Sequence, residues 1–199
     1  MYKDKIPNVI LSANAWYHDE PFKLWAIICR KKGTKLVGYQ HGGVYFTYKN
    51  NFYVNHESSI VERYYSWGEE RINMKNVKPF YSQKYRPQNN KKTCDILMVS
   101  NVYSKYHHFL EIFQTPYSVK VKDNTSFFNL LDKGLIVKYR GARVDYGWGE
   151  ISKYQKAYPN MQLSNTNNDC VKEMTVSRVV VFDSVHATSL LEAIMMNIP

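Results

Sequence analysis

Three short stretches of this sequence place polar or charged residues directly after apolar runs. QHGG (40–43) follows KLVGY (35–39), RGARVDYGWG (140–149) follows LIVKY (135–139), and DSVHATSLLEA (183–193) follows RVVVF (178–182). In open α/β sheets, ligands bind beyond the carboxyl ends of the strands, in the loops that lead to the next helix. These three stretches are therefore the candidate functional sites.

The first stretch combines a histidine with two glycines. His41 can act as a general base or as a hydrogen-bond donor to phosphate. Gly42 and Gly43 lack a Cβ atom, so backbone N–H groups there can approach a ligand closely. The alternative interpretation is that His41 is a hydrogen-bonded structural residue, which is the commoner role of a single histidine near a strand end.

The second stretch places an arginine at a strand end. Arg140 suits bidentate binding of a diphosphate. Asp145, Gly147 and Gly149 follow it, and the glycines let the loop fold back over a bound group. The alternative is that Arg140 is a surface ion-pair partner.

The third stretch predicts an anion site at the start of a helix. Asp183 closes the strand, and hydroxyl side chains follow at Ser184, Thr188 and Ser189. A helix N-terminus with hydroxyls nearby attracts phosphate, and Glu192, one turn into the helix, can hold the two hydroxyls of a ribose. In the alternative interpretation, Ser184 and Thr188 are simple helix caps.

Strands and helices that alternate along the chain must position these residues. An apolar run at 8–11, a helix that begins near Asp19–Pro21 and ends at Gly33, and the run 35–39 have the length of a βαβ unit. After residue 93 the alternation resumes, with strands at 95–100, 135–140 and 178–183, a weak strand at 161–164, and helices near 104–113, 124–132, 167–174 and 189–196.

The predicted fold class is α/β, with two Rossmann-like, doubly wound parallel sheets. The first domain is predicted at 1–71 and the second, which binds the nucleotide donor, at 94–199. Residues 72–93 contain prolines, clustered Asn and Gln and no apolar period, which is typical of a linker. Both sheets are expected to be incomplete, because MMNIP (195–199) stops where a further strand is due.

Composition narrows the function classes. A formal charge of +10, from 27 Lys and Arg against 17 Asp and Glu, favours an anionic partner. The three cysteines are widely spaced, which favours a reducing compartment and indicates neither a disulfide framework nor a zinc site. No stretch is long and apolar enough for a membrane span, so we expect a cytoplasmic protein whose basic face can rest on the anionic inner leaflet.

The tyrosine-rich segment 45–65 has two interpretations. It can be a half-buried packing surface between the sheet and the linker, or a platform for a sugar or a base; the packing role is favoured.

Taken together, these motifs resemble those of a family of bacterial surface-carbohydrate transferases. The resemblance runs from about residue 33 to the end and depends on QHGG with a following Trp-Gly, on the Arg and DYGW segment, and on DS, TSLLEA and NIP. That family is similar to teichoic-acid glycerophosphotransferases and to other enzymes with the two-Rossmann GT-B glycosyltransferase fold.

The resemblance implies a donor site in a cleft between two domains. His41, Gly42 and Gly43 would face it from the first domain, and Arg140 would meet the diphosphate. Ser184, Thr188 and Ser189 would bind phosphate, and Glu192 would hold the ribose. Such folds need no bound metal or other cofactor, because cationic side chains and helix dipoles stabilise the leaving group.

The predicted function is therefore transfer of a sugar or polyol phosphate from a nucleotide-activated donor to a cell-surface glycan precursor, with a glycan or lipid-linked acceptor. The alternative is a non-catalytic nucleotide- or glycan-binding module derived from such a transferase. Nucleic acid is not expected as a partner, because the basic residues form no stripe along the sequence and no RNA or DNA motif is present.

Overall fold

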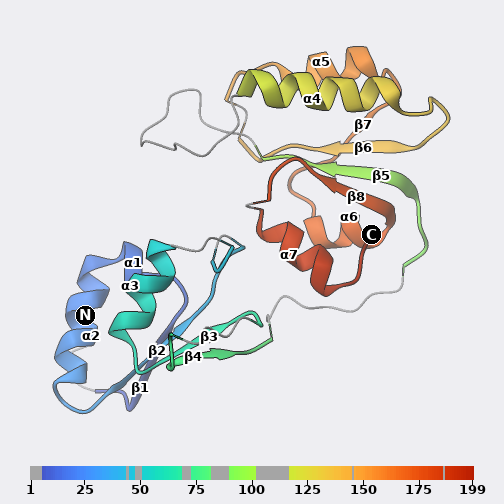
Figure 1. Ribbon diagram of the computed structural model, residues 1–199. Helices are drawn as coiled ribbons and strands as arrows, with labels where there is room; N and C mark the ends of the chain where they lie inside the picture. Colours follow the sequence, from blue (N-terminus) through green and yellow to red (C-terminus); the bar gives the residue numbers. More distant parts are fainter. Residues whose placement is uncertain are drawn as a thin grey trace. The chain divides into compact units, whose positions relative to one another are not determined.

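Two four-stranded parallel sheets, one in each half of the chain, form the framework of the protein. The computed structural model describes residues 6–43, 45–47, 51–68, 73–81, 90–101, 117–144, 146–185 and 187–199. The chain divides into two units, Met1–Tyr85 and Arg86–Pro199, and each unit holds one sheet (Figure 1). The predicted α/β class with two parallel sheets is confirmed.

The first sheet has the strand order β1-β2-β3-β4, the same as the order along the chain. Its strands are β1 (Val9–Ser12), β2 (Lys35–Tyr39), β3 (Arg63–Ser66) and β4 (Val77–Pro79), and the helices of this unit are α1 (Ala15–His18), α2 (Glu20–Arg30) and α3 (Phe52–Ile60). The start of α2 agrees with the prediction, because Asp19 is its N-cap and accepts a hydrogen bond from the Phe22 N–H at 2.9 Å.

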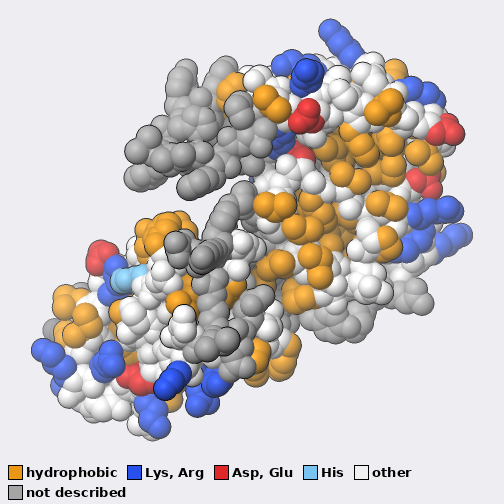
Figure 2. Space-filling view, in the orientation of Figure 1, with side chains coloured by type: hydrophobic (Ala, Val, Ile, Leu, Met, Phe, Trp, Pro, Cys, Tyr) orange, Lys and Arg blue, Asp and Glu red, His pale blue; other side chains and the backbone are white. Residues whose placement is uncertain are grey.

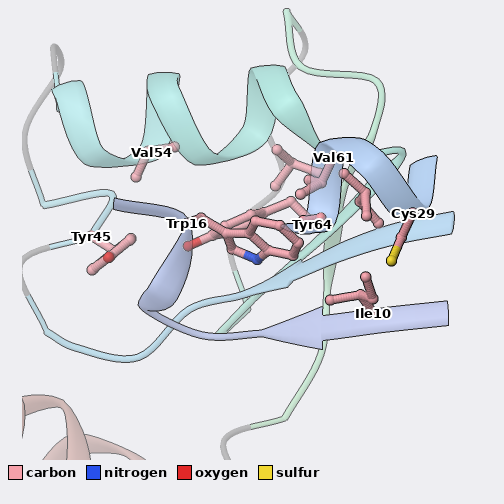
Figure 3. Close-up of a cluster of buried hydrophobic side chains, with 10 residues drawn as sticks. Ile10, Trp16, Cys29, Tyr45, Val54, Val61 and Tyr64 are labelled. Carbon is pink, nitrogen blue, oxygen red and sulfur yellow. The ribbon is translucent and has the colours of Figure 1, made fainter. Parts of the chain in front are cut away.

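The helices of this unit lie on one face of its sheet (Figure 1). Right-handed crossovers that add each strand in the same direction place successive helices on the same face. One buried cluster fills the space between this face and the helices, with Ile10 from β1, Trp16 from α1, Val54 from α3 and Tyr64 from β3 (Figure 3). The helices in the described part of this unit therefore lie on one face of the sheet (Figure 1).

Gly38 in β2 is required by a close approach inside this cluster. A Cβ atom at Gly38 would lie 2.4 Å from Cδ2 of Tyr64 on the neighbouring strand. Because Gly38 pairs with Tyr64 in the parallel ladder, the absent side chain makes room for the tyrosine ring. The ring of Tyr64 can then pack in the core cluster of this unit.

The second sheet has the order β7-β6-β5-β8, so the chain reverses direction after β7. Its strands are β5 (Cys94–Val99), β6 (Val137–Arg140), β7 (Gln162–Leu163) and β8 (Ser177–Phe182), and its helices are α4 (Tyr117–Leu130), α5 (Glu150–Ala157), α6 (Cys170–Thr175) and α7 (Thr188–Met195). The reversal places α4 and α5 on one face and α6 and α7 on the other (Figure 1).

Alternating side chains of β5 supply both cores of this unit. Met98 packs with Phe128 and Tyr154 under α4 and α5, whereas Leu97 and Val99 pack with other buried side chains under α6 and α7. A strand that is buried on both faces reads as a continuous apolar run, which is why the sequence located β5 to within one residue. The apolar run VVVF located β8 equally well, although Val179 is exposed.

Three features differ from the sequence-based predictions. The predicted linker 72–93 contains β4, in which Val77 is fully buried and pairs with Tyr64. The tyrosine-rich segment contains α3 and β3. The helix predicted at 124–132 begins earlier, at Tyr117, and the helix predicted near 104–113 lies outside the described residues. No helix in the described part of the chain has the length and apolar character that a membrane crossing requires.

Candidate functional site

The carboxyl edge of the first sheet is held together by Gln40, which follows β2 directly. Gln40 is 2% exposed; its Nε2 donates to the Gly42 carbonyl at 2.9 Å and its Oε1 accepts from the Trp67 backbone N–H at 2.8 Å. Its own N–H donates to the Tyr65 carbonyl at 2.8 Å. Gln40 thus ties the loop after β2 to the loop after β3. This role was not predicted from the sequence, although a glutamine directly after a buried strand was a visible signal.

His41 begins a series of hydrogen bonds that leads from the surface into the core. The exposed His41 imidazole lies with Nδ1 2.9 Å from the Tyr45 hydroxyl, which donates to Glu57 Oε1 at 2.8 Å. The Tyr64 hydroxyl donates to the other carboxylate oxygen, Glu57 Oε2, at 3.1 Å. We call these four side chains the histidine relay. In Figure 3, Tyr45 and Tyr64 both lie below α3, which carries Glu57.

Burial governs the electrostatics of the histidine relay. Glu57 is fully buried, and burial raises its pKa from 4.5 to about 7, although the hydrogen bonds from Tyr45 and Tyr64 oppose the rise. Burial, reinforced by the Glu57 charge, raises the pKa of both tyrosine hydroxyls above the ordinary value. Both tyrosines therefore remain O–H donors at neutral pH.

An aromatic cluster of α1 and α3 continues from the histidine relay. The Tyr45 ring lies 6.0 Å from the Tyr53 ring, which stacks on Phe52 at 4.1 Å and meets Tyr17 edge-on at 4.6 Å. Phe52 is 57% exposed, so part of this cluster is open to solvent. The segment 45–65 thus supplies buried tyrosines to the core and exposed aromatic rings to the surface.

The carboxyl edge of the second sheet carries a different polar cluster, centred on Asp183. Its Oδ2 accepts from the Ser100 hydroxyl at 2.5 Å and from Asn124 Nδ2 at 3.0 Å, and it forms an ion pair with Lys120 Nζ at 3.0 Å. Its Oδ1 accepts from the Asn101 N–H at 3.1 Å. We call these residues the aspartate network.

The aspartate network lies at the topological switch point of its sheet. Ser100 follows β5 and Asp183 follows β8, and these two neighbouring strands are where the chain reverses its direction through the sheet. Ligands of open α/β sheets bind at this point. The side chains of Lys120 and Asp183 are only 6% and 4% exposed, so the ion pair itself is buried.

Sequence reasoning singled out Asp183 and missed the other four members of the aspartate network, Ser100, Asn101, Lys120 and Asn124. Lys120 and Asn124 belong to α4 and are buried beneath it, where an isolated sequence reads them as surface residues. Asn124 Nδ2 also donates to the Tyr154 hydroxyl on α5 at 3.1 Å. The spacing of four residues between Lys120 and Asn124, which places both on one helix face, was the available signal.

Arg140 lies at the end of β6 and is 7% exposed. Its Nη1 donates to Glu173 Oε2 of α6 at 2.7 Å and to the Asn165 carbonyl at 3.3 Å. Its Nη2 donates to the carbonyls of Thr166, at 3.2 Å, and Asn168, at 2.7 Å. These contacts hold the segment 165–168 against α6. The predicted contact with a diphosphate stays a prediction.

The other predicted residues of the second unit lie around α7 and the loop before α5. The helix α7 begins at Thr188 with Ala187 as its N-cap and without a side-chain hydrogen bond to the cap, so Ser184 and Thr188 are not N-caps. Ser184, Thr188 and Ser189 are half-buried, and Glu192 is 7% exposed. Gly147 and Gly149 take positive φ values of 74° and 66°, and Asp145 lies outside the described residues.

The predicted residues divide between the two units. His41, Gly42 and Gly43 belong to the first; Arg140, Ser184, Thr188, Ser189 and Glu192 belong to the second. Their convergence on one donor stays a prediction. Among the described residues, no group of three or more His, Cys, Asp or Glu side chains has the arrangement of a metal site.

Parallel sheets with polar clusters beyond their carboxyl edges define the class of α/β proteins that bind ligands there. The chain belongs to a transferase family, since the model of the LIC12162 family transferase matches residues 1–199. The predicted resemblance to a transferase family is confirmed.

No curated protein matches the chain. Among solved structures, the crystal structure of Acinetobacter baumannii MurG is similar to it, with 11% sequence identity and a TM-score of 0.47. The similarity covers 88% of this chain and 46% of the MurG chain, so the chain spans about half the length of that protein.

Proposed function

We propose that the chain is the nucleotide-dependent core of a GT-B-type transferase. It moves a sugar or a polyol phosphate from a nucleotide-activated donor to a cell-surface glycan precursor. The observation that carries this proposal is an exposed histidine, His41, fixed at the carboxyl edge of a parallel sheet in a chain whose family consists of transferases. The net charge of +10 supports an anionic donor and contact with the anionic inner face of the membrane.

In the proposed reaction, the His41 imidazole accepts the proton of an acceptor hydroxyl. The acceptor oxygen then forms a bond to the sugar anomeric carbon as the bond to the diphosphate oxygen breaks, and the nucleoside diphosphate leaves with both electrons. With a polyol phosphate donor, the same oxygen attacks phosphorus and a nucleoside monophosphate leaves. In both cases the proton passes from His41 to water.

The donor is assigned to the second unit. The start of α7 supports phosphate binding there, because its first N–H groups and the hydroxyls of Thr188 and Ser189 are close in the chain. The proposal keeps Ser184 at the phosphate, Glu192 at the ribose, and Arg140 and Asp145 at the diphosphate, with Gly42 and Gly43 facing it from the first unit. The aromatic cluster beside His41 is proposed to receive the acceptor.

One observation favours a second candidate, a non-catalytic nucleotide- or glycan-binding module. Two cationic side chains of the second unit, Arg140 and Lys120, are each paired with a buried carboxylate. A transferase of this type depends on cationic groups to stabilise the leaving diphosphate. Because both side chains are already paired, they stabilise the negative charge of a leaving group less.

The test is nucleotide binding and turnover by the full chain. UDP, CDP, GDP and their sugar or glycerol conjugates are titrated by calorimetry, and release of the nucleotide product is followed in the presence of a membrane glycolipid extract. Binding with turnover that His41→Ala abolishes, while binding is retained, supports the transferase. Binding without turnover, unchanged in His41→Ala, supports the binding module. If no nucleotide binds, the transferase is wrong and of the second candidate only a glycan-binding module remains.

A further inference from the structure

The histidine relay joins an exposed imidazole to a fully buried carboxylate through one tyrosine. His41 is exposed, Tyr45 is 3% exposed and Glu57 is 0% exposed. The two bonds measure 2.9 Å from His41 Nδ1 to the Tyr45 hydroxyl and 2.8 Å from that hydroxyl to Glu57 Oε1. Burying a carboxylate is costly, and a neutral side chain of similar shape would fill the core at lower cost. The charge therefore needs a reason beyond packing.

The direction of each proton in the relay follows from the donor inventory. A tyrosine hydroxyl has a single proton, and the Tyr45 proton is donated to Glu57 Oε1. The second carboxylate oxygen, Oε2, accepts from Tyr64. The Tyr45 oxygen can therefore only accept from the imidazole, which requires a proton on His41 Nδ1. In the neutral ring the lone pair then lies on Nε2.

We propose that Tyr45 and Glu57 are positioning residues that hold neutral His41 in its Nδ1–H tautomer, so that Nε2 is the atom that accepts the proton of the acceptor hydroxyl. The reaction in this inference depends on the proposed function; the tautomer does not. Tyr45 transmits the orientation and Glu57 anchors it from the core. Neither residue touches the reacting atoms.

The ionisation of Glu57 sets the conditions under which the relay has this direction. Its pKa is raised by burial to about 7, so the carboxylate is charged in mildly alkaline solution and gains a proton below neutral pH. The titratable groups that act on Glu57 and Tyr45 are Tyr64 from β3 and Tyr53 from α3, together with His41 itself. The Nδ1–H tautomer is therefore expected to dominate at pH 8.

The test is the tautomer of His41, read from the imidazole nitrogens of the full chain by NMR. The chain is labelled with ¹⁵N-histidine and measured at pH 8, and the His41 signals are assigned by their loss in His41→Asn. In the wild-type protein we expect Nδ1 to carry the proton. In Tyr45→Phe we expect the ring to change to the Nε2–H form that histidine favours in water. In Glu57→Gln the amide oxygen can still accept from Tyr45, so the Nδ1–H form should persist.

Matched variants separate the relay from general effects on the core. Tyr53→Phe alters a ring that contacts Tyr45 and should leave the His41 tautomer unchanged. Tyr64→Phe removes the other hydroxyl from Glu57 and should also preserve the Nδ1–H form, because the Tyr45 bond persists. Amide spectra report whether each variant is folded. If Glu57→Gln does not fold, the His41 tautomers of the wild-type protein and of Tyr45→Phe still test the proposal.

An Nε2–H tautomer in the wild-type protein, or an unchanged tautomer in Tyr45→Phe, would overturn the proposal. If a nucleotide-dependent turnover is found, Tyr45→Phe should lower it by roughly 10- to 100-fold and alter its pH profile without weakening nucleotide binding. If Tyr45→Phe instead keeps the turnover rate and the pH profile of the wild-type protein, the proposal is also overturned. Absence of nucleotide binding would contradict the proposed function alone, because the imidazole signals need no substrate.

Discussion

Each sheet carries a polar cluster at its own carboxyl edge, but the two clusters differ in how their charged groups are arranged. The histidine relay runs in one line from a buried carboxylate to an exposed imidazole. The aspartate network closes on itself: a buried carboxylate accepts from Ser100, Asn101 and Asn124 and is neutralised by Lys120. The histidine relay presents a titratable group at the surface. In the aspartate network the two opposite charges are paired with each other inside the protein.

The topology of each sheet accounts for this difference. In the second sheet the chain reverses, so the ends of β5 and β8 lie side by side between helices on both faces. A cluster there is enclosed and must satisfy its own charges. The first sheet adds its strands in one direction, with the helices of its described part on one face. The first unit therefore exposes a titratable imidazole, whereas the charges of the aspartate network are paired within the second unit.

Breaking the aspartate network should have the largest effect on stability. Asp183→Asn leaves the Lys120 ammonium buried without its counter-charge, which we expect to cost about 3–5 kcal/mol of unfolding free energy in the second unit. Urea unfolding, combined with hydrogen exchange at β5 and β8, measures the loss. The double variant Asp183→Asn, Lys120→Met should recover most of it, because the unpaired charge is gone.

An exposed ion pair in the same unit provides the control. Arg178 Nε lies 3.3 Å from Asp95 Oδ1, with the arginine side chain 72% exposed. Arg178→Gln should change stability by less than about 1 kcal/mol. If Asp183→Asn costs no more than this control, the buried ion pair is not what stabilises the second unit.

Substitution of Arg140 should have the next largest effect on stability. It tests whether Arg140 holds the segment 165–168 in place. Arg140→Lys keeps the charge but loses the planar fork that reaches Glu173 and the carbonyls of 165–168. We expect a loss of about 3 kcal/mol, with faster hydrogen exchange at 165–168. Arg178→Lys serves as the matched exchange of arginine for lysine. Unchanged stability together with loss of nucleotide binding would instead place Arg140 at the diphosphate.

Elements marked by local signals were predictable from the sequence. The strand at 35–39 was located to the residue, because an apolar run follows a helix that ends near Gly33, and Asp19 correctly marked the start of α2. His41 and Asp183 were singled out because each follows a buried strand. Such signals lie within a few residues of the feature that they predict.

Elements that depend on distant polar partners were not predictable. The helix α3 buries Glu57 and Ser58 beside Val54, so it has no apolar stripe. Glu57 is tolerated there only because Tyr45 and Tyr64 donate to it. Lys120 is likewise buried because of Asp183, which lies far along the chain. A hydrophobic pattern treats such residues as exposed, and only the folded chain reveals their partners.

A substitution at Gly38 disturbs the histidine relay through its member Tyr64. Gly38→Ala places a methyl group 2.4 Å from Cδ2 of the Tyr64 ring, so the ring or the strand must shift. A shift of the ring would strain its hydrogen bond to Glu57. We expect a loss of about 2 kcal/mol in the first unit, measured by thermal unfolding. Gly134→Ala, whose added methyl group would meet Asp132 Oδ1 at 3.4 Å, is the control and should stay within about 0.5 kcal/mol. Equal effects would mean that the close approach is not what requires glycine.

The last effect is the pH dependence that Glu57 gives to the first unit. Its pKa is raised from 4.5 to about 7 in the folded protein. Below pH 4.5 both states are protonated; between the two values the folded state holds the proton that the unfolded state releases, so stability falls as the pH rises through this window. Above this window the contribution of Glu57 to the unfolding free energy no longer changes with pH. Glu57→Gln should remove this slope.

The slope is measured as the difference in unfolding free energy between the wild-type protein and Glu57→Gln from pH 4 to 9, and a carboxyl ¹³C titration reports Glu57 directly. Tyr64→Phe sharpens the test, because it deletes a hydrogen bond that lowers the pKa of Glu57 and should move the end of the window to higher pH. Parallel pH profiles for all three proteins would mean that Glu57 is ionised throughout this range. The carboxylate would then stay charged below neutral pH, and the relay would keep its direction there instead of losing it as Glu57 gains a proton.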